Sequence, residues 1–124
     1  MDTKKLENLP KADGEIEKGK AHIMVELIEY EHESIVSKTI MKRAAGSVNA
    51  MSFPSGEGLD QKTAPFDTYV QIIDGSANIE VDGRETLLET GDGILIPAHK
   101  PSQIIPNGRF KLIATVIKSG YEDL

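Results

Sequence analysis

The chain has 124 residues, enough for one domain with its own core and too few for two domains of ordinary size. Its 20 acidic side chains outnumber its 14 basic ones, and the formal charge of −6 argues against nucleic acid as a partner, because phosphate is repelled. There is no cysteine, which excludes disulfides, thiolate nucleophiles and sulfur-ligated zinc.

The N-terminal residues are polar and are interrupted by Pro10, Gly14 and Gly19. This composition predicts a loosely held arm over residues 1–20, followed by one domain over residues 21–124. No apolar run reaches the roughly 20 residues that cross a bilayer, and no secretory signal is recognisable at the start. We therefore expect a cytoplasmic protein with no membrane partner.

Two runs rich in β-formers follow the arm. Residues 23–30 fit a strand, but Ile23, Leu27 and Tyr30 fall near helical spacing, so a helix stays open as an alternative. Residues 34–43 contain several side chains branched at Cβ, and this favours a strand.

From Ser47 onward, turn residues recur roughly every eight to twelve positions, the rhythm of an all-β sandwich or barrel. Asp74-Gly75-Ser76 is expected to end one strand. Asp82-Gly83 offers the left-handed backbone angles of a tight hairpin. Strands are predicted over residues 47–53, 66–73, 77–81, 84–90, 94–97 and 109–118.

Two blocks, "GEGLDQKTAPFDTYVQIIDG" and "GDGILIPAHKPSQIIP", resemble the two short motifs of the cupin superfamily. The family pattern of the first is G-x5-H-x-H-x3-E-x6-G, which fits from Gly56 to Gly75 without a gap. The second, G-x5-P-x-G-x2-H-x3-N, fits from Gly91 with Pro97 at the proline position. The resemblance, closest to small single-domain bacterial cupins of the cupin 2 conserved-barrel type, implies a jelly-roll β-barrel, also called a double-stranded β-helix.

The metal ligands of the family motifs are replaced in this chain. The family holds a divalent metal with three histidines and one glutamate, and those positions are here Lys62, Ala64, Thr68 and Ser102. A lysine must lose its proton to coordinate, alanine has no donor atom, and neutral hydroxyls are poor ligands for transition metals. Pro106 stands at the asparagine position of the family. The motifs are degenerate, and we predict no metal and no other cofactor.

The remaining histidines give no metal-binding pattern. His22 and His32 lie among glutamates and are interpreted as surface residues. His99 stands where the family motif has glycine, three residues before Ser102. Strand alternation would turn its side chain away from the pocket, whereas a turn could bring it to the rim, and both alternatives stay open.

If the barrel closes as the family resemblance implies, alternation turns a defined set of side chains inward: Lys62, Ala64, Thr68, Val70, Ile72, Ser102 and Ile104. The candidate ligand-binding residues are Lys62, Thr68, Ser102 and His99. Lys62 could instead reach solvent along its methylene stem, or be neutralised by Asp60 or Asp67. We predict no catalytic residue, because Ser102 has no histidine at a useful spacing.

The favoured function is that of a metal-free small-molecule-binding cupin, a sensor or accessory protein, that holds an anionic or polar metabolite. One alternative is a metal-dependent cupin enzyme of isomerase or dioxygenase type that uses atypical ligands such as His99 with carboxylates. Another is a non-catalytic dimerisation module. We also expect a homodimer, because residues 35–41 with the outward Tyr69 and Gln71 offer an apolar or mixed face.

Overall fold

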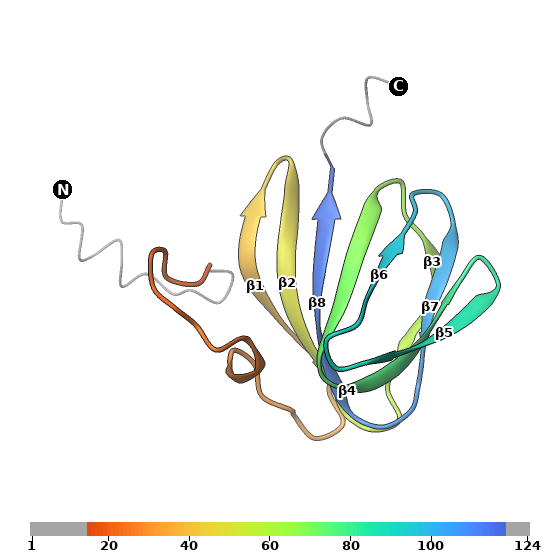
Figure 1. Ribbon diagram of the computed structural model, residues 1–124, viewed down its shortest axis with the longest axis horizontal. Coiled ribbons are helices and arrows are strands. Elements are labelled where there is room, and N and C mark those ends of the chain that lie inside the picture. The colour runs from red at the N-terminus through yellow and green to blue at the C-terminus, as the bar shows by residue number, and fades with distance from the viewer. Residues whose placement is uncertain (1–14, 119–124) are drawn as a thin grey trace.

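From Val36 to Ile117 the chain consists of antiparallel β-strands and the turns between them. The computed structural model describes residues 15–118, and Figure 1 shows the strands curling around a common interior. One short 3-10 helix, η1, spans Met24–Glu26. The strands are β1 (Val36–Arg43), β2 (Gly46–Phe53), β3 (Leu59–Thr63), β4 (Asp67–Val81), β5 (Arg84–Glu89), β6 (Gly93–Ile96), β7 (Pro101–Ile105) and β8 (Phe110–Ile117).

The predicted all-β barrel is confirmed. The strands expected for residues 34–43, 47–53, 84–90, 94–97 and 109–118 are present, with ends displaced by about two residues at most. β3 and β7 come from segments for which the turn pattern predicted no strand. β3 is mostly exposed and polar, and β7 begins at Pro101, so neither carries the usual strand signal.

Strand β4 links the two sheets of the barrel. Its first half pairs with β8 and β6, and its second half pairs with β5 and β7. The expectation that Asp74-Gly75-Ser76 ends a strand was wrong, because the chain bends there and continues in extended form. A register shift between Ile72 and Asp74 and a left-handed Gly75 (φ 78°) make the bend. A Cβ at Gly75 would lie 2.6 Å from the Arg109 carbonyl oxygen, so the bend requires glycine.

The predicted hairpin at Asp82-Gly83 is confirmed. Val81 pairs with Arg84, and the two residues between them have positive φ angles of 51° and 84°. Two consecutive left-handed residues are what a two-residue hairpin turn of the right twist needs.

One end of the barrel is filled by packed aromatic and aliphatic side chains. The rings of Phe53 and Phe110 stack with centroids 4.4 Å apart, and both residues are fully buried. Around them lies the rest of the core, made by Val70, Ile72, Ala77, Ile79, Leu88, Ile104 and Leu112. Because the stacked rings occupy this end, any interior space lies toward the opposite end.

The segment before β1 covers part of the outer face of the β2–β8 sheet. Ser52 donates a hydrogen bond to the Glu29 carbonyl at 2.8 Å, and the Lys111 ammonium donates to the Val25 carbonyl at 2.7 Å. Ile28, a residue of this segment, is buried. The prediction of a strand or helix over residues 23–30 was wrong apart from η1, because these carbonyls bond to side chains of the sheet instead of to a regular ladder.

Tyr30 anchors this segment to the same face. Its hydroxyl donates to the Asp74 carboxylate at 2.6 Å, while the Arg109 and Lys111 cations lie 4.5 and 4.8 Å from its ring centroid. Burial, and then the hydrogen bond to Asp74, raise the pKa of the Tyr30 phenol far above its ordinary value.

The polar arm meets the free edge of β1. The Ile16 amide donates to the Ile40 carbonyl at 3.2 Å, and the Glu15 carboxylate accepts from the Lys42 amide and pairs with Arg43. These contacts, the Lys42 amide first, lower the pKa of the Glu15 carboxyl. Residues 1–14 of the predicted arm lie outside the described residues.

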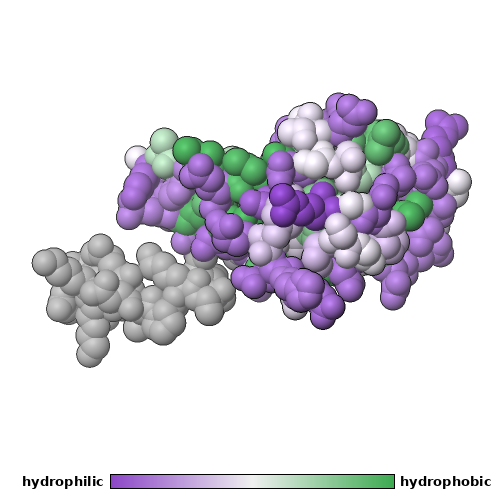
Figure 2. All heavy atoms as spheres, turned by 90° about the horizontal axis from the view of Figure 1, so that it is seen from below, coloured by the Kyte–Doolittle hydropathy of each residue, from purple (hydrophilic) through white to green (hydrophobic). Residues whose placement is uncertain are grey.

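The outer face of the sheet carries exposed apolar side chains. Met41, Val48, Thr115, Tyr69 and Leu95 are successive cross-strand neighbours in a row over β1, β2, β8, β4 and β6. Of these, Met41, Tyr69 and Leu95 are 45%, 43% and 59% exposed. In the view of Figure 2 the surface is largely hydrophilic, and its largest hydrophobic area lies on the side of the N-terminal segment. No helix among residues 15–118 is long and apolar enough to span a membrane.

Candidate functional site

A cavity of about 260 Å³ occupies the barrel interior. β3, β4 and β7 line it from one side, and β2, β8 and the start of β4 line it from the other. Its wall is mainly apolar, because the inward positions of these strands carry aliphatic side chains at every second residue. The larger apolar residues that line it are Met51, Leu59, Phe66, Val70, Ile79, Ile96, Ile104, Leu112 and Val116.

The predicted inward face is largely confirmed. Six of its members line the cavity, namely Lys62, Ala64, Thr68, Val70, Ser102 and Ile104. Ile72 also points inward but is fully buried in the core and does not reach the cavity wall. Lys62 and Ser102, 40 residues apart in the chain (102 − 62), are directly opposite each other in the β3–β7 ladder.

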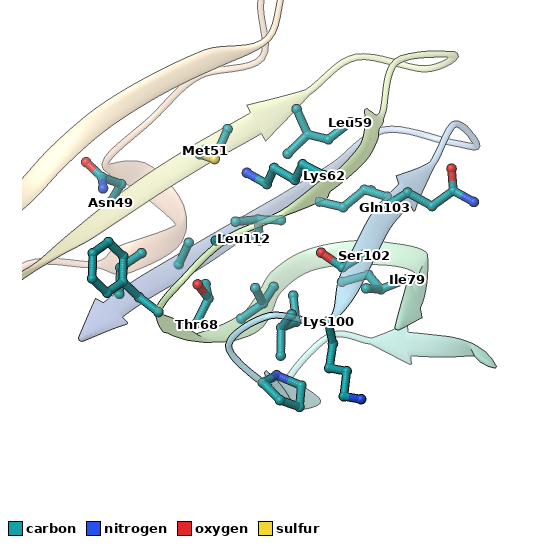
Figure 3. A pocket seen from close by; sticks show the side chains of 18 of the residues that line it. Asn49, Met51, Leu59, Lys62, Thr68, Ile79, Lys100, Ser102, Gln103 and Leu112 are labelled. Atoms are coloured by element: carbon teal, nitrogen blue, oxygen red, sulfur yellow. The ribbon is translucent and has the colours of Figure 1, made fainter. Parts of the chain in front are cut away.

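Three polar side chains turn into the cavity. In Figure 3 the Lys62 ammonium and the hydroxyls of Thr68 and Ser102 point toward the space above Leu112. Ser102 is only 8% exposed as a residue. Its hydroxyl forms no hydrogen bond with the described residues but stays accessible from the cavity, because no buried side-chain nitrogen or oxygen among residues 15–118 lacks a partner. A hydroxyl that faces a cavity without a protein partner is available to hydrogen-bond a ligand there.

Lys62 is an unpaired cation. No carboxylate within residues 15–118 forms an ion pair with its ammonium, so the suggested neutralisation by Asp60 or Asp67 does not occur. Asp67 instead accepts a hydrogen bond from the Ala98 amide at 2.8 Å. Lys62 as a whole is exposed, which places its ammonium at the mouth of the cavity, where the charge remains hydrated.

Four other polar residues line the cavity, namely Ser37, Asn49, Lys100 and Gln103, and the last two are engaged elsewhere. The Gln103 amide donates to the Glu80 carboxylate at 3.1 Å, and the Lys100 ammonium lies 3.8 Å from Asp82. Both heads point away from the centre in Figure 3. Asn49 lines the cavity from β2 and was missed by sequence reasoning, although alternation along residues 47–53 could have placed it there.

His99 does not line the cavity. It adopts a left-handed conformation (φ 68°), and its amide donates to the Ala64 carbonyl at 2.7 Å. The cupin motif has glycine at this position, and the positive φ explains why the turn favours glycine there. The side chain is exposed, so a role for His99 in binding stays a prediction that the lining of the cavity does not support.

His22 and His32 also lie outside the cavity. The His22 ring is 3.0 Å from the Glu17 carbonyl, and the His32 ring is 3.5 Å from the Glu33 carboxylate with 92% of its side chain exposed.

The residues at the former ligand positions do not fit a transition metal. Lys62 offers an ammonium, Ala64 a methyl group, and Thr68 and Ser102 offer neutral hydroxyls, whereas such metals take imidazole, thiolate or carboxylate donors. Within the described part of the chain, no three or more His, Asp or Glu side chains lie together as a ligand group.

The charge of the cavity is opposite in sign to that of the whole chain. Lys62 and Lys100 line it, and no Asp or Glu is among the lining residues of the described chain. In a protein of formal charge −6, an unpaired ammonium at the mouth of a mainly apolar cavity favours an anion over a cation.

Comparison with solved structures places the fold among cupins, although neither a protein-family model nor a curated protein matches the sequence. A conserved protein of unknown function from Streptococcus pyogenes aligns with a TM-score of 0.78 at 24% identity, over 83% of this chain and 90% of that one. A cupin superfamily protein from Desulfitobacterium hafniense aligns with a TM-score of 0.74 at 25% identity, over 83% and 94%.

A third similar structure is that of a cupin 2 conserved barrel domain protein from Leptotrichia buccalis. It aligns at 32% identity with a TM-score of 0.72, and the match spans 76% of this chain but only 46% of that longer protein. Together with the two motif frames and the strand order, these similarities establish that the chain is a member of the cupin superfamily with a cupin-type jelly-roll barrel.

Proposed function

We propose that this protein is a metal-free cupin that binds a small anionic or polar metabolite in the barrel interior, at Lys62, Thr68 and Ser102. The observation that carries the proposal is the cavity-facing hydroxyl of Ser102, which has no partner among the described residues, directly opposite an unpaired lysine in a mainly apolar cavity. Polar groups that face a pocket and have no protein partner can orient a ligand by hydrogen bonds. We propose the role of a sensor or an accessory subunit, because a protein in either role binds a metabolite without needing a catalytic group.

Thermal unfolding across a panel of organic acids and sugar phosphates tests the proposal. A compound that binds only the folded protein raises the Tm by an amount that grows with the logarithm of its concentration relative to Kd, and about 100-fold excess over Kd adds ~2.7 kcal/mol of stability. The rise should be lost in Lys62→Ala. If no compound shifts the Tm of either protein, the proposal fails.

No specific observation favours the alternative of a metal-dependent isomerase or dioxygenase. Elemental analysis of untagged protein discriminates between the two. We expect no stoichiometric transition metal, and a stoichiometric metal that disappears in His99→Ala would replace the proposal with the enzyme alternative.

A cytoplasmic location and a homodimer both remain predictions. The exposed apolar row on the sheet that contains Met41, Tyr69 and Leu95 supports the second, because exposed apolar patches commonly mark interfaces.

A further inference from the structure

We infer that the ligand is an amphipathic monocarboxylate, with one carboxylate joined to an apolar body somewhat larger than a benzene ring. The inference rests on the proposed function and narrows it, because organic acids and sugar phosphates would otherwise be equal candidates. Three properties of the cavity lead to this class: its charge, the placement of its polar groups and its size.

Among the polar groups that line the cavity, two lie directly opposite each other. Lys62 and Ser102 are a directly opposed cross-strand pair, and such pairs have Cβ atoms roughly 4.5–5.5 Å apart. A carboxylate has two oxygens, so one can accept from the ammonium and the other from the hydroxyl. Thr68 supplies one more hydroxyl from β4. This set matches one anionic head group.

The floor of the cavity offers no hydrogen bonds. Val70, Ile79 and Leu112 form it, with 4%, 0% and 1% of their surface exposed. A sugar ring carries hydroxyls on every side, and those that face this floor would lose water without gaining a partner. An apolar body gains instead, because its contact with these side chains removes hydrocarbon from water.

The size of the body follows from the volume. An engineered apolar cavity of about 150 Å³ is sufficient for benzene. The 260 Å³ of this cavity, part of which the carboxylate occupies, leaves room for a ring with a short linker.

Isothermal titration with matched probes tests the inference. The reference probe is 3-phenylpropanoate. It is compared with the neutral 3-phenylpropanamide, the cationic phenethylamine, acetate as the head group alone, and glucose 6-phosphate. The amide should bind about tenfold or more weakly than the carboxylate, because a hydrogen bond to a charged group is lost. Acetate, phenethylamine and glucose 6-phosphate should show no measurable heat at the same concentration.

Variants connect the binding to the named groups. Lys62→Met keeps the hydrocarbon stem and removes the charge, so it should weaken 3-phenylpropanoate about tenfold while leaving the amide unchanged. Lys42→Met removes one exposed charge from β1, outside the cavity, and serves as the control. Ala64→Leu fills part of the cavity and should weaken both phenyl probes.

The outcomes separate this inference from the proposed function. If glucose 6-phosphate binds, its binding is lost in Lys62→Met, and 3-phenylpropanoate does not bind, then the proposed ligand class is wrong and the proposed binding function stands. Equal affinity for the amide and the carboxylate also overturns the class, because the charge then contributes nothing. Binding of no probe, in a protein whose Tm the wider panel also leaves unchanged, rejects both.

Discussion

Two buried serines give a direct test of which polar groups serve the fold and which serve the site. Ser52 is fully buried and donates to the Glu29 carbonyl at 2.8 Å, whereas Ser102 is 8% exposed and its hydroxyl faces the cavity. Replacing each by alanine removes the same oxygen atom. The two variants therefore differ only in what the hydroxyl was doing.

Ser52→Ala removes one hydrogen bond and leaves the Glu29 carbonyl without that donor beneath the N-terminal segment. A lost bond and an unsatisfied buried partner together cost about 1–3 kcal/mol. For a chain of this length, each kcal/mol corresponds to roughly 3–6 °C in Tm. Ser102→Ala breaks no hydrogen bond within the described protein, so its free energy of unfolding should stay within about 0.5 kcal/mol of the wild type.

Urea unfolding followed by circular dichroism measures both free energies, and unchanged m values would show that the comparison is valid. The combination we expect is a destabilised Ser52→Ala with intact ligand binding and a stable Ser102→Ala with weakened binding. If Ser102→Ala is as destabilised as Ser52→Ala, then Ser102 is a structural residue, and the main support for the binding site is lost.

Three further predictions concern the bend, the N-terminal anchor and the outer face. Gly75→Ala should lower the free energy of unfolding by at least about 2 kcal/mol, because a left-handed backbone strain of ~1–2 kcal/mol is added to a clash of the new Cβ. Gly83→Ala should cost only about the strain, because its Cβ meets nothing within 4 Å. Chemical denaturation of both variants checks this difference. The raised pKa of Tyr30 means that the folded state resists forming phenolate. The protonated phenol therefore stabilises the fold fully below about pH 10, and this stabilisation is lost as the pH rises further. Above pH 10 the Tm of the wild type should consequently fall more steeply than that of Tyr30→Phe, and parallel curves would contradict the assignment. Leu95→Glu should convert a dimer into a species of single-chain mass in light scattering, and a wild type that is already monomeric at working concentration would end the homodimer prediction.

The sequence by itself determined the class of fold and the identity of the inward positions. Turn residues act through local backbone geometry, so the hairpin at Asp82-Gly83 was predictable. The inward Lys62, Thr68 and Ser102 followed from the resemblance to the cupin motifs, with strand alternation applied to the barrel that it implies. The sequence also showed that the metal ligands of the cupin motifs are replaced in this chain, because the donor atoms of a side chain are set by its residue type and not by its surroundings.

Only the tertiary structure decided which polar groups remain free. Sequence proximity suggested that Asp60 or Asp67 would neutralise Lys62, yet Asp67 is bound to the Ala98 amide, which the turn after β6 brings to it. Likewise, Asp74-Gly75-Ser76 resembled a strand end, and the packing of Gly75 against Arg109 turned it into a bend that joins two sheets. Partners of this kind come from chain segments that are distant in sequence, and no local pattern encodes them.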